Sequence, residues 1–405
     1  MKFAHMADCH IGSWREPKLR EISIQAFLKA ADLCIEKQVD FILIAGDLFN
    51  NSLPAIDKLK TTVTKLKQLK DKGIPVYIVP GSHDFSPSGK TILDVLEEAG
   101  LLANVVKGQI VENELKLNFT VDEKTGAKIT GMLGKRGMLE KAYYESLNKE
   151  NLENEDGFKI FMFHTALTEL KPKELEKMDS APISFLPRGF DYYAGGHVHI
   201  IEKSDLDCYK NVIYPGPLFP NSFSELEKLG CGGFYIYDNG EISYEQVQIV
   251  NVEPINVDVN HLTPEQAEEE IKKRIKNKEF INTIVTIRLA GILESGKVSD
   301  INFNGIFEML YSKSAYFVMK NTNLLRTKEL EEIKINTSDV DEIETSLIKE
   351  HLQQIKVGGM DAEREEQITK QLMQVLSIER EREEGEKVAD FEKKIKDEVS
   401  RILGI

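Results

Sequence analysis

Three apolar runs near the start of the sequence each end in acidic residues or histidines, and segments with helical periodicity separate them. The runs are residues 2–8 (KFAHMAD), 40–47 (DFILIAGD) and 74–84 (IPVYIVPGSHD). The second run is almost purely apolar, as is typical of a strand that is covered on both faces. Between the runs, apolar residues recur at helical spacing over 18–38 and 55–72. Strands that alternate with helices in this way predict right-handed crossovers and a parallel sheet.

The later part of this region adds strands of both orientations. Residues 158–166 (FKIFMFHTA) and 190–199 (FDYYAGGHVH) are further strand-like runs. The pair Asn239-Gly240 is a strong signal for a hairpin turn within residues 232–250. We therefore expect the fold class α/β, in the form of a layered α/β sandwich with mixed sheets.

Shifts in composition predict three domains. The α/β sandwich would span residues 1–251, and a small α/β capping domain would span 252–335. Residues 336–405 are helical and highly charged, and form C-terminal helices with apolar stripes. Such stripes usually fold back on their own domain, but a charged tail after a complete catalytic unit favours helix-in-groove docking to a partner. One stripe comprises Val388, Phe391, Ile395, Val399 and Ile402.

Composition limits the classes of protein that this chain can represent. The net charge of −15 argues weakly against a broad basic surface for nucleic acid. The four cysteines form no CxxC pair, which favours a reduced, cytosolic protein. No apolar run approaches the roughly 18 residues of a membrane span, and the N-terminus lacks the apolar core of a signal peptide. We expect a cytoplasmic protein without membrane contact.

Each strand-like run ends in side chains that can bind metal. Sites form at the carboxyl ends of strands in open α/β sheets. The i, i+2 spacing of Asp8/His10 and of His197/His199 predicts that each pair lies on one strand face. Carboxylate and imidazole ligands suit Mn²⁺, Fe²⁺ or Zn²⁺, and two ions roughly 3.5–4 Å apart could hold a phosphate if one carboxylate bridges them. The motif residues are Asp8, His10, Asp47, Ser82, His83, Asp84, His164, His197 and His199.

The order D-x-H, G-D, G-x-H-D, H and G-H-x-H resembles the signature of the calcineurin-like metallophosphoesterases. The segments VDFILIAGDLF, GDLFN, YYAGGHVH and YPGP further resemble the meiotic-recombination-type nuclease subunits of archaeal and eukaryotic double-strand-break repair complexes, whose bacterial counterpart is SbcD. The resemblance covers about residues 1–250 in motifs. The later regions match the family only in layout.

The resemblance implies a role for each motif residue and two Mn²⁺ ions, or other divalent transition metals, per subunit. His83 would donate a proton or a hydrogen bond to the phosphate, and Asp84 would orient its imidazole. The implied metal ligands are Asp8, His10 and His199 for the first ion, His164 and His197 for the second, and Asp47 as the bridge.

Ser82 departs from the family pattern, which has an asparagine ligand of the second metal at this position. A serine hydroxyl is shorter than an amide and a poorer neutral donor. It could ligate directly, ligate through water, or leave the position open. We therefore expect weaker or more exchangeable binding of the second metal, and activity that needs excess Mn²⁺.

Trp14, Arg15, Lys18 and Arg20 follow the first ligand pair closely. A loop there could stack on DNA or grip its phosphates. The alternative is a solvated loop with one packed indole.

The function implied by the resemblance is a Mn-dependent DNA nuclease that acts in double-strand-break repair, with 3′–5′ exonuclease action on duplex ends and endonuclease action on single strands. The implied partners are DNA, an SMC-like ABC ATPase bound through the C-terminal helices, and a second copy of the chain, which would place the protein at the nucleoid. The helix at 55–72 and the segment after Asp84 are candidates for the dimer contact. Two alternatives stay open: a phosphodiesterase for other substrates, and a weakly active scaffold that tethers DNA.

Overall fold

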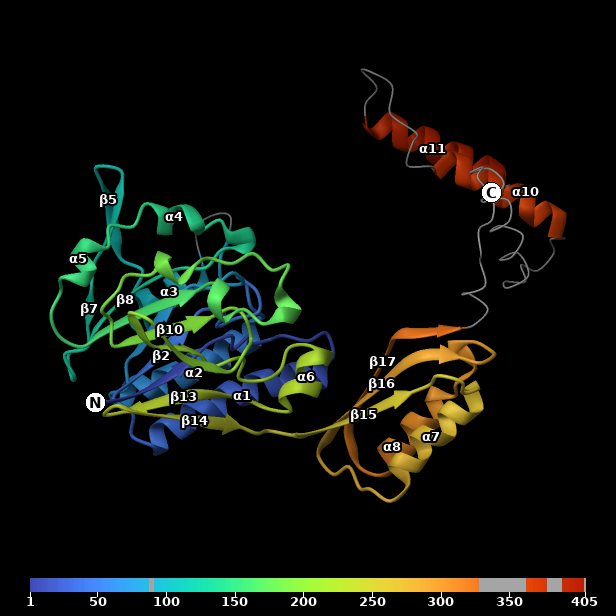
Figure 1. Ribbon diagram of the computed structural model, residues 1–405, viewed down its shortest axis with the longest axis horizontal. Coiled ribbons are helices and arrows are strands. Elements are labelled where there is room, and N and C mark those ends of the chain that lie inside the picture. Colours follow the sequence, from blue (N-terminus) through green and yellow to red (C-terminus); the bar gives the residue numbers. More distant parts are fainter. Residues whose placement is uncertain (87–90, 328–361, 377–387, 404–405) are drawn as a thin grey trace. The chain divides into compact units, whose positions relative to one another are not determined.

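A computed structural model describes most of the 405-residue chain (Figure 1). Contacts within the chain define two compact units, Met1–Thr327 and Lys328–Ile405. The finer division at residues 251 and 335 stays a prediction. The described residues are 1–86, 91–327, 362–376 and 388–403.

The first unit contains two six-stranded mixed sheets that pack face to face, which confirms the predicted layered α/β class. Large aromatic side chains fill the space between the sheets. The ring of Phe3, from the first sheet, stacks on Phe41 at 5.0 Å and meets Tyr192 of the second sheet edge-on at 5.0 Å. Burying such rings in an inter-sheet core is a main source of stability in packed sheets.

The first sheet has a parallel centre, as the alternating pattern predicts. Helix α1 (Pro17–Glu36) begins with a proline at its first turn, where no backbone donor is needed, and buries an apolar face against this sheet. Helices α2 (Ile56–Asp71) and α3 (Ile92–Glu98) follow the next two strands. In spatial order the strands are β14 (Glu241–Val247), β13 (Gly232–Asp238), β1 (Lys2–Met6), β2 (Phe41–Ala45), β3 (Val76–Val79) and β4 (Ala103–Asn104).

The hairpin predicted at Asn239-Gly240 is confirmed. Asp238 pairs with Glu241 across a two-residue loop, and both loop residues have positive φ angles, 50° at Asn239 and 101° at Gly240. This conformation matches the twist of the flanking strands, which explains the Asn-Gly sequence.

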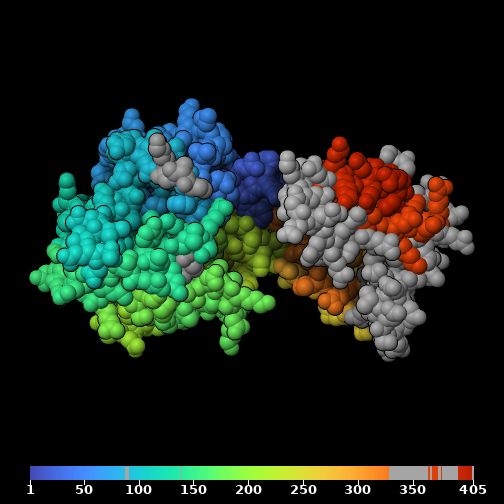
Figure 2. All heavy atoms as spheres, turned by 90° about the horizontal axis from the view of Figure 1, so that it is seen from above, coloured from blue at the N-terminus to red at the C-terminus, as the bar shows by residue number. Residues whose placement is uncertain are grey.

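The second sheet is also parallel at its centre, where β9 (Lys159–His164) lies between β8 (Lys128–Met132) and β10 (Tyr192–Gly196). A separate hairpin, β5 (Gly108–Val111) with β6 (Glu114–Leu117), follows the last parallel strand of the first sheet in the sequence. The helices α4 (Lys141–Glu145) and α5 (Glu150–Glu153) connect β8 to β9. In the space-filling view of Figure 2, the blue and cyan segments form one side of this part and the green segments the other. In spatial order the strands are β11 (Glu202–Leu206), β12 (Tyr209–Tyr214), β10 (Tyr192–Gly196), β9 (Lys159–His164), β8 (Lys128–Met132) and β7 (Thr120–Val121).

A smaller parallel sheet follows, formed by β15 (Asn251–Asp258), β16 (Thr283–Leu293) and β17 (Ala315–Thr327). Helices α7 (Pro264–Lys276) and α8 (Phe303–Ser312) cover one face of this sheet (Figure 1). Helix α7 begins with a capping box between Thr263 and Gln266.

The second unit contains α10 (Ala362–Leu376) and α11 (Val388–Leu403), which contact each other. The stripe from Val388 to Ile402 is helical as predicted. A further apolar stripe that the sequence predicts, from Ile343 to Ile355, lies outside the described residues. Among the described helices, none combines the length and the apolar character that crossing a bilayer requires.

Candidate metal centre

The predicted ligands converge at one edge of the two facing sheets. They follow the carboxyl ends of β1, β2 and β3 in the first sheet and of β9 and β10 in the second. Parallel neighbours end at the same edge, so residues that are distant in the sequence meet there. In three overlapping groups, the candidate ligand atoms lie within 4.8 Å of one another: Asp8, His10 and His199; His10, Asp47 and His83; Asp8, Asp47 and His164.

The backbone reaches this geometry through left-handed turns and not through continuing strands. Strand β1 ends at Met6 and β10 at Gly196, before either ligand pair. The prediction that each i, i+2 pair shares a strand face is therefore wrong. Positive φ is uncommon in residues other than glycine and clusters at functional sites. The φ angles are 50° at Asp8, 42° at His10, 53° at Asp47, 99° at His197 and 52° at His199.

The Asp47 carboxylate lies at the centre of the cluster. Its Oδ2 is 3.6 Å from His10 Nε2 and 3.2 Å from His164 Nε2. Its Oδ1 accepts a hydrogen bond of 2.7 Å from the backbone N–H of His83. Asp47 belongs to two of the three groups, so one carboxylate faces ligands from both sheets.

The motif glycines are required because ligands lie directly against them. A Cβ at Gly46 would lie 2.1 Å from His164 Nδ1, and one at Gly81 would lie 2.2 Å from Asp47 Oδ1. A Cβ at Gly196 would lie 2.1 Å from the carbonyl oxygen of Ala45. Any side chain at these positions would displace a ligand or the strand that carries it.

Backbone carbonyls orient two of the histidines through Nδ1. His164 Nδ1 lies 2.8 Å from the carbonyl oxygen of Ala45, and His83 Nδ1 lies 2.8 Å from that of Asn50. A proton on Nδ1 satisfies each carbonyl, so Nε2 is the nitrogen that stays available to the cluster. The histidines are therefore prepared to ligate or to act through Nε2.

Glu225 orients a third histidine and was missed in the sequence. It lies on α6 (Phe223–Leu229), and its Oε2 is 3.2 Å from Nδ1 of His199. The Ser222-x-x-Glu225 spacing marks a helix start, but nothing in the sequence links this helix to the GHxH motif.

The donor set fits a divalent transition ion. His164 Nε2 is buried and has no hydrogen-bond partner within the described chain, although it faces the Asp47 carboxylate. An orphaned buried nitrogen needs a partner, and a cation between it and the carboxylate would supply one. Carboxylates and imidazoles without cysteine match the ligand preferences of Mn²⁺, Fe²⁺ or Zn²⁺ at a reactive site.

The electrostatics of the metal-free cluster divide the histidines into two classes. Burial, with repulsion from neighbouring histidines, lowers the pKa of His10 and of His197 to about 3. Burial opposes protonation of His164, but the Asp47 carboxylate raises its pKa to about 10. Burial likewise opposes protonation of His199, but nearby carboxylates raise its pKa to about 9.

The prediction that Asp84 orients the His83 ring is wrong. Asp84 is 2% exposed and accepts hydrogen bonds from the backbone N–H groups of Leu48, Phe49 and Gly81, at 3.3, 3.2 and 3.0 Å. A buried carboxylate with three such donors is held firmly, and it joins the loops after β2 and β3. Asp84 thus acts on His83 only by fixing the turn that carries it.

Ser82 and His197 lie at the cluster without belonging to the three groups. Ser82 is buried, and its hydroxyl lies 3.5 Å from Asp47 Oδ2. The His197 ring centroid is 5.1 Å from that of His164, and the His197 backbone N–H donates to Asp8 at 3.0 Å. Both positions suit the predicted second ion, and their roles as ligands stay predictions.

The loop after the first ligand pair has mostly structural contacts. Trp14 packs against the core and donates from Nε1 to the carbonyl oxygen of Pro220 at 3.0 Å, as the packed-indole alternative expects. Arg20 donates to the carbonyl oxygens of Trp14 and Arg15 at 3.0 and 2.8 Å. Lys18 donates to the carbonyl oxygen of Tyr316 at 3.3 Å. The Arg15 side chain is exposed, and DNA contact by these residues stays a prediction.

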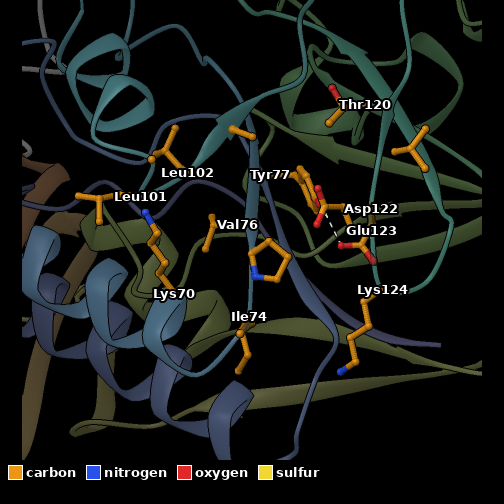
Figure 3. A pocket seen from close by; sticks show the side chains of 15 residues that line it. Lys70, Ile74, Val76, Tyr77, Leu101, Leu102, Thr120, Asp122, Glu123 and Lys124 are labelled. Carbon is orange, nitrogen blue, oxygen red and sulfur yellow. Dashed lines mark hydrogen bonds between the residues drawn. The ribbon is translucent and has the colours of Figure 1, made fainter.

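A cavity of about 550 Å³ lies elsewhere, at the amino end of β3 (Figure 3). Apolar side chains such as Val76 and Leu102 line it, and Tyr77 donates to Asp122 at 2.9 Å on its wall. None of the clustered ligands lines this cavity. This cavity is therefore separate from the candidate metal site.

Replacing Gly46 with alanine should abolish metal binding. The new Cβ would clash with His164, and the positive φ of 86° adds strain of about 1–2 kcal/mol. Gly73→Ala is the matched control, since its φ is also positive (68°) but its Cβ would meet open space. Thermal unfolding should show the backbone strain in both variants and a further destabilisation from the clash in Gly46→Ala. Mn²⁺ titration should show loss of binding in Gly46→Ala alone. Equal Mn²⁺ binding by the two variants would show that the space left by the missing Cβ at Gly46 is not needed for metal binding.

Metal binding near pH 7 should release protons. The raised pKa values of His164, about 10, and His199, about 9, mean that both rings are protonated before loading, and a cation can bind only their neutral forms. Affinity for Mn²⁺ should therefore increase as the pH rises from about 7 to about 9. Calorimetric titration in two buffers with different ionisation enthalpies measures the release, and a binding enthalpy that is the same in both buffers would refute it.

Comparison with known proteins agrees with this geometry. Residues 1–200 match the family model of the calcineurin-like phosphoesterases. The DNA double-strand break repair protein Mre11 of Methanococcus maripaludis is 28% identical over 369 residues, which cover 86% of this chain and 91% of that protein. Mre11 of Archaeoglobus fulgidus is 27% identical over 361 residues, which cover 86% of this chain and 80% of that protein. Residues 1–200 therefore form a calcineurin-like phosphoesterase domain, and this family implies a hydrolase that uses divalent metal ions.

Proposed function

We propose that this protein is a Mn²⁺-dependent DNA nuclease of double-strand-break repair, with 3′–5′ exonuclease action on duplex ends and endonuclease action on single strands. The observation that carries the proposal is the convergence of two carboxylates and five imidazoles around Asp47. The similarity to archaeal Mre11 proteins extends over 86% of the chain, beyond the phosphoesterase domain, and supports DNA as the substrate.

Some residues of the cluster would bind the metal ions, and His83 would transfer a proton. Two divalent ions, when bound, would clamp the phosphate and activate a water molecule for attack. Asp8, His10 and His199 would hold one ion, His164 and His197 the other, and Asp47 would bridge them.

His83 would donate a proton or a hydrogen bond to the oxygen that leaves phosphorus. Its ring centroid is 4.8 Å from that of His10, and the Asn50 carbonyl fixes its orientation through Nδ1. The remaining nitrogen, Nε2, would carry the proton.

A cavity of about 500 Å³ lies beside the His83 loop and would accept the DNA backbone. Arg15, Arg20 and Lys58 line it together with Asn50 and with Asp57, which lies 3.6 Å from the Lys58 ammonium. Cationic side chains there would contact phosphates without reading sequence.

The proposed partners are an SMC-like ABC ATPase and a second copy of the chain. The apolar stripe of α11 would dock in a groove of the ATPase. Leu53, in the loop before α2, and Ile56, the first residue of α2, are both 83% exposed, and Val95 on α3 is 59% exposed. Such exposed apolar side chains suit a dimer contact. With these partners the protein would act at the nucleoid.

Replacing His83 with alanine should lower the rate of DNA cleavage by about 10²–10⁴-fold, the usual contribution of a positioned acid or base. Mn²⁺ binding should stay within about twofold of wild type, because the assigned ligands remain. A nuclease assay on duplex ends and on single strands, with Mn²⁺ titration of the same samples, measures both quantities. Loss of metal binding would make His83 a ligand instead, and undiminished cleavage would remove it from the mechanism.

The nuclease assay, extended to a small phosphodiester substrate, separates the proposed nuclease from the two alternatives, a phosphodiesterase for other substrates and a scaffold that tethers DNA. Cleavage of bis-p-nitrophenyl phosphate without cleavage of DNA would favour another phosphodiester substrate. DNA binding without cleavage, even with Mn²⁺ and the ATPase, would favour a tethering scaffold.

Replacing Ser82 with asparagine should strengthen binding of the second ion by about tenfold, the effect of about 1.4 kcal/mol from a better ligand. Activity at limiting Mn²⁺ should rise, and activity at saturating Mn²⁺ should change little. Unchanged activity at limiting Mn²⁺ would show that the serine is an equivalent ligand.

A further inference from the structure

Helix α6 lies against the metal cluster and points a carboxylate at it. Glu225 Oε2 is 3.2 Å from His199 Nδ1, and both side chains are mostly shielded, with 23% and 21% exposed. The other nitrogen of the same ring, Nε2, lies 3.0 Å from His10 Nε2 and 3.7 Å from Asp8 Oδ1. The ring of His199 thus has one nitrogen on Glu225 and the other in the cluster.

Local hydrogen bonds hold the Glu225 carboxylate in place. The backbone N–H of Asn221 donates to Oε2 at 2.9 Å, and the Ser222 hydroxyl donates to Oε1 at 3.1 Å. The backbone N–H of Glu225 donates to the Ser222 hydroxyl at 3.2 Å, which caps the helix. Both carboxylate oxygens are therefore fixed before any metal binds.

The helix itself is held from the side of the small sheet. Arg288, on β16, donates to both carboxylate oxygens of Glu227, and its guanidinium lies 5.1 Å from the Phe223 ring centroid. On the other side, the carbonyl oxygen of Pro220 accepts the Trp14 indole N–H. A bidentate ion pair of this kind stabilises the contact and also fixes the orientation of the two side chains.

The His199 side chain needs such support because its own backbone does not hold it firmly in place. Its φ of 52° is unfavourable for a residue with a side chain, and β10 ends before it. An acceptor on Nδ1 fixes both the tautomer and the plane of the ring, so that the Nε2 lone pair faces the cluster.

We propose that Glu225 is a positioning residue that holds His199 as a metal ligand, an inference that rests on the proposed metal-dependent function. Glu225 would not touch the substrate. It would act through His199, in a carboxylate–histidine–metal arrangement supplied by a helix outside the recognised motifs.

The test compares three full-length variants by Mn²⁺ titration, followed by the electron paramagnetic resonance signal of free Mn²⁺. Glu225→Ala should bind Mn²⁺ about 10- to 100-fold more weakly than wild type, the usual effect of removing such a partner. The Mn²⁺ affinity of Glu225→Gln should lie between those of wild type and Glu225→Ala, because glutamine keeps the helix cap and one carbonyl acceptor. Lys228→Gln, which removes a charge from a side chain that is 62% exposed on the same helix and lies away from His199, should bind like wild type.

A purely structural role predicts a different pattern. If Glu225 only caps α6, Glu225→Ala would lower the thermal unfolding temperature of the metal-free protein and leave Mn²⁺ affinity within twofold of wild type. That result, or equal weakening by Lys228→Gln, would overturn the inference. Wild-type protein that binds Mn²⁺ but does not cut DNA would refute the nuclease proposal and leave the Glu225 assignment standing.

Discussion

The position of the Asp47 carboxylate is the constraint on which the rest of the site depends. It lies within 3.6 Å of His10 Nε2 and 3.2 Å of His164 Nε2, and it accepts the His83 backbone N–H at 2.7 Å. These partners come from both sheets, so the carboxylate can meet them only if the sheets pack with their carboxyl ends at one edge. Gly46 and Gly81 make the approach possible, because any Cβ there would occupy the space of a ligand.

A second layer of contacts fixes the groups that surround Asp47. Carbonyl oxygens of Ala45 and Asn50 orient His164 and His83, and Asp84 ties together the loops after β2 and β3. These partners are mostly backbone atoms, whose positions follow from the strands. The strained, left-handed residues of the cluster are thus held by the parallel sheets beneath them, as expected where a fold stores strain at a functional site.

The small sheet and the phosphoesterase sheets share contacts close to the cluster. Lys18 and Tyr316 exchange hydrogen bonds with each other's backbone carbonyls, and Arg288 grips the helix that carries Glu225. Residues that the sequence suggested for DNA binding, above all Lys18 and Trp14, therefore have structural contacts as well. Arg15 remains exposed beside the cavity that the proposed function assigns to the DNA backbone.

The sequence by itself determined the class of fold, the main helices and the residue types of the site. Apolar runs and helical spacing reflect burial, and the GHxH and GD motifs place metal-binding chemistry at strand ends. It could not give the turns at Asp8 and His199, because strand alternation says nothing of a chain that has left the strand. It also misassigned the partner of His83, and it left Glu225 unnoticed. Those contacts join residues far apart in the chain, and only the packing of sheets and helices decides which distant groups meet.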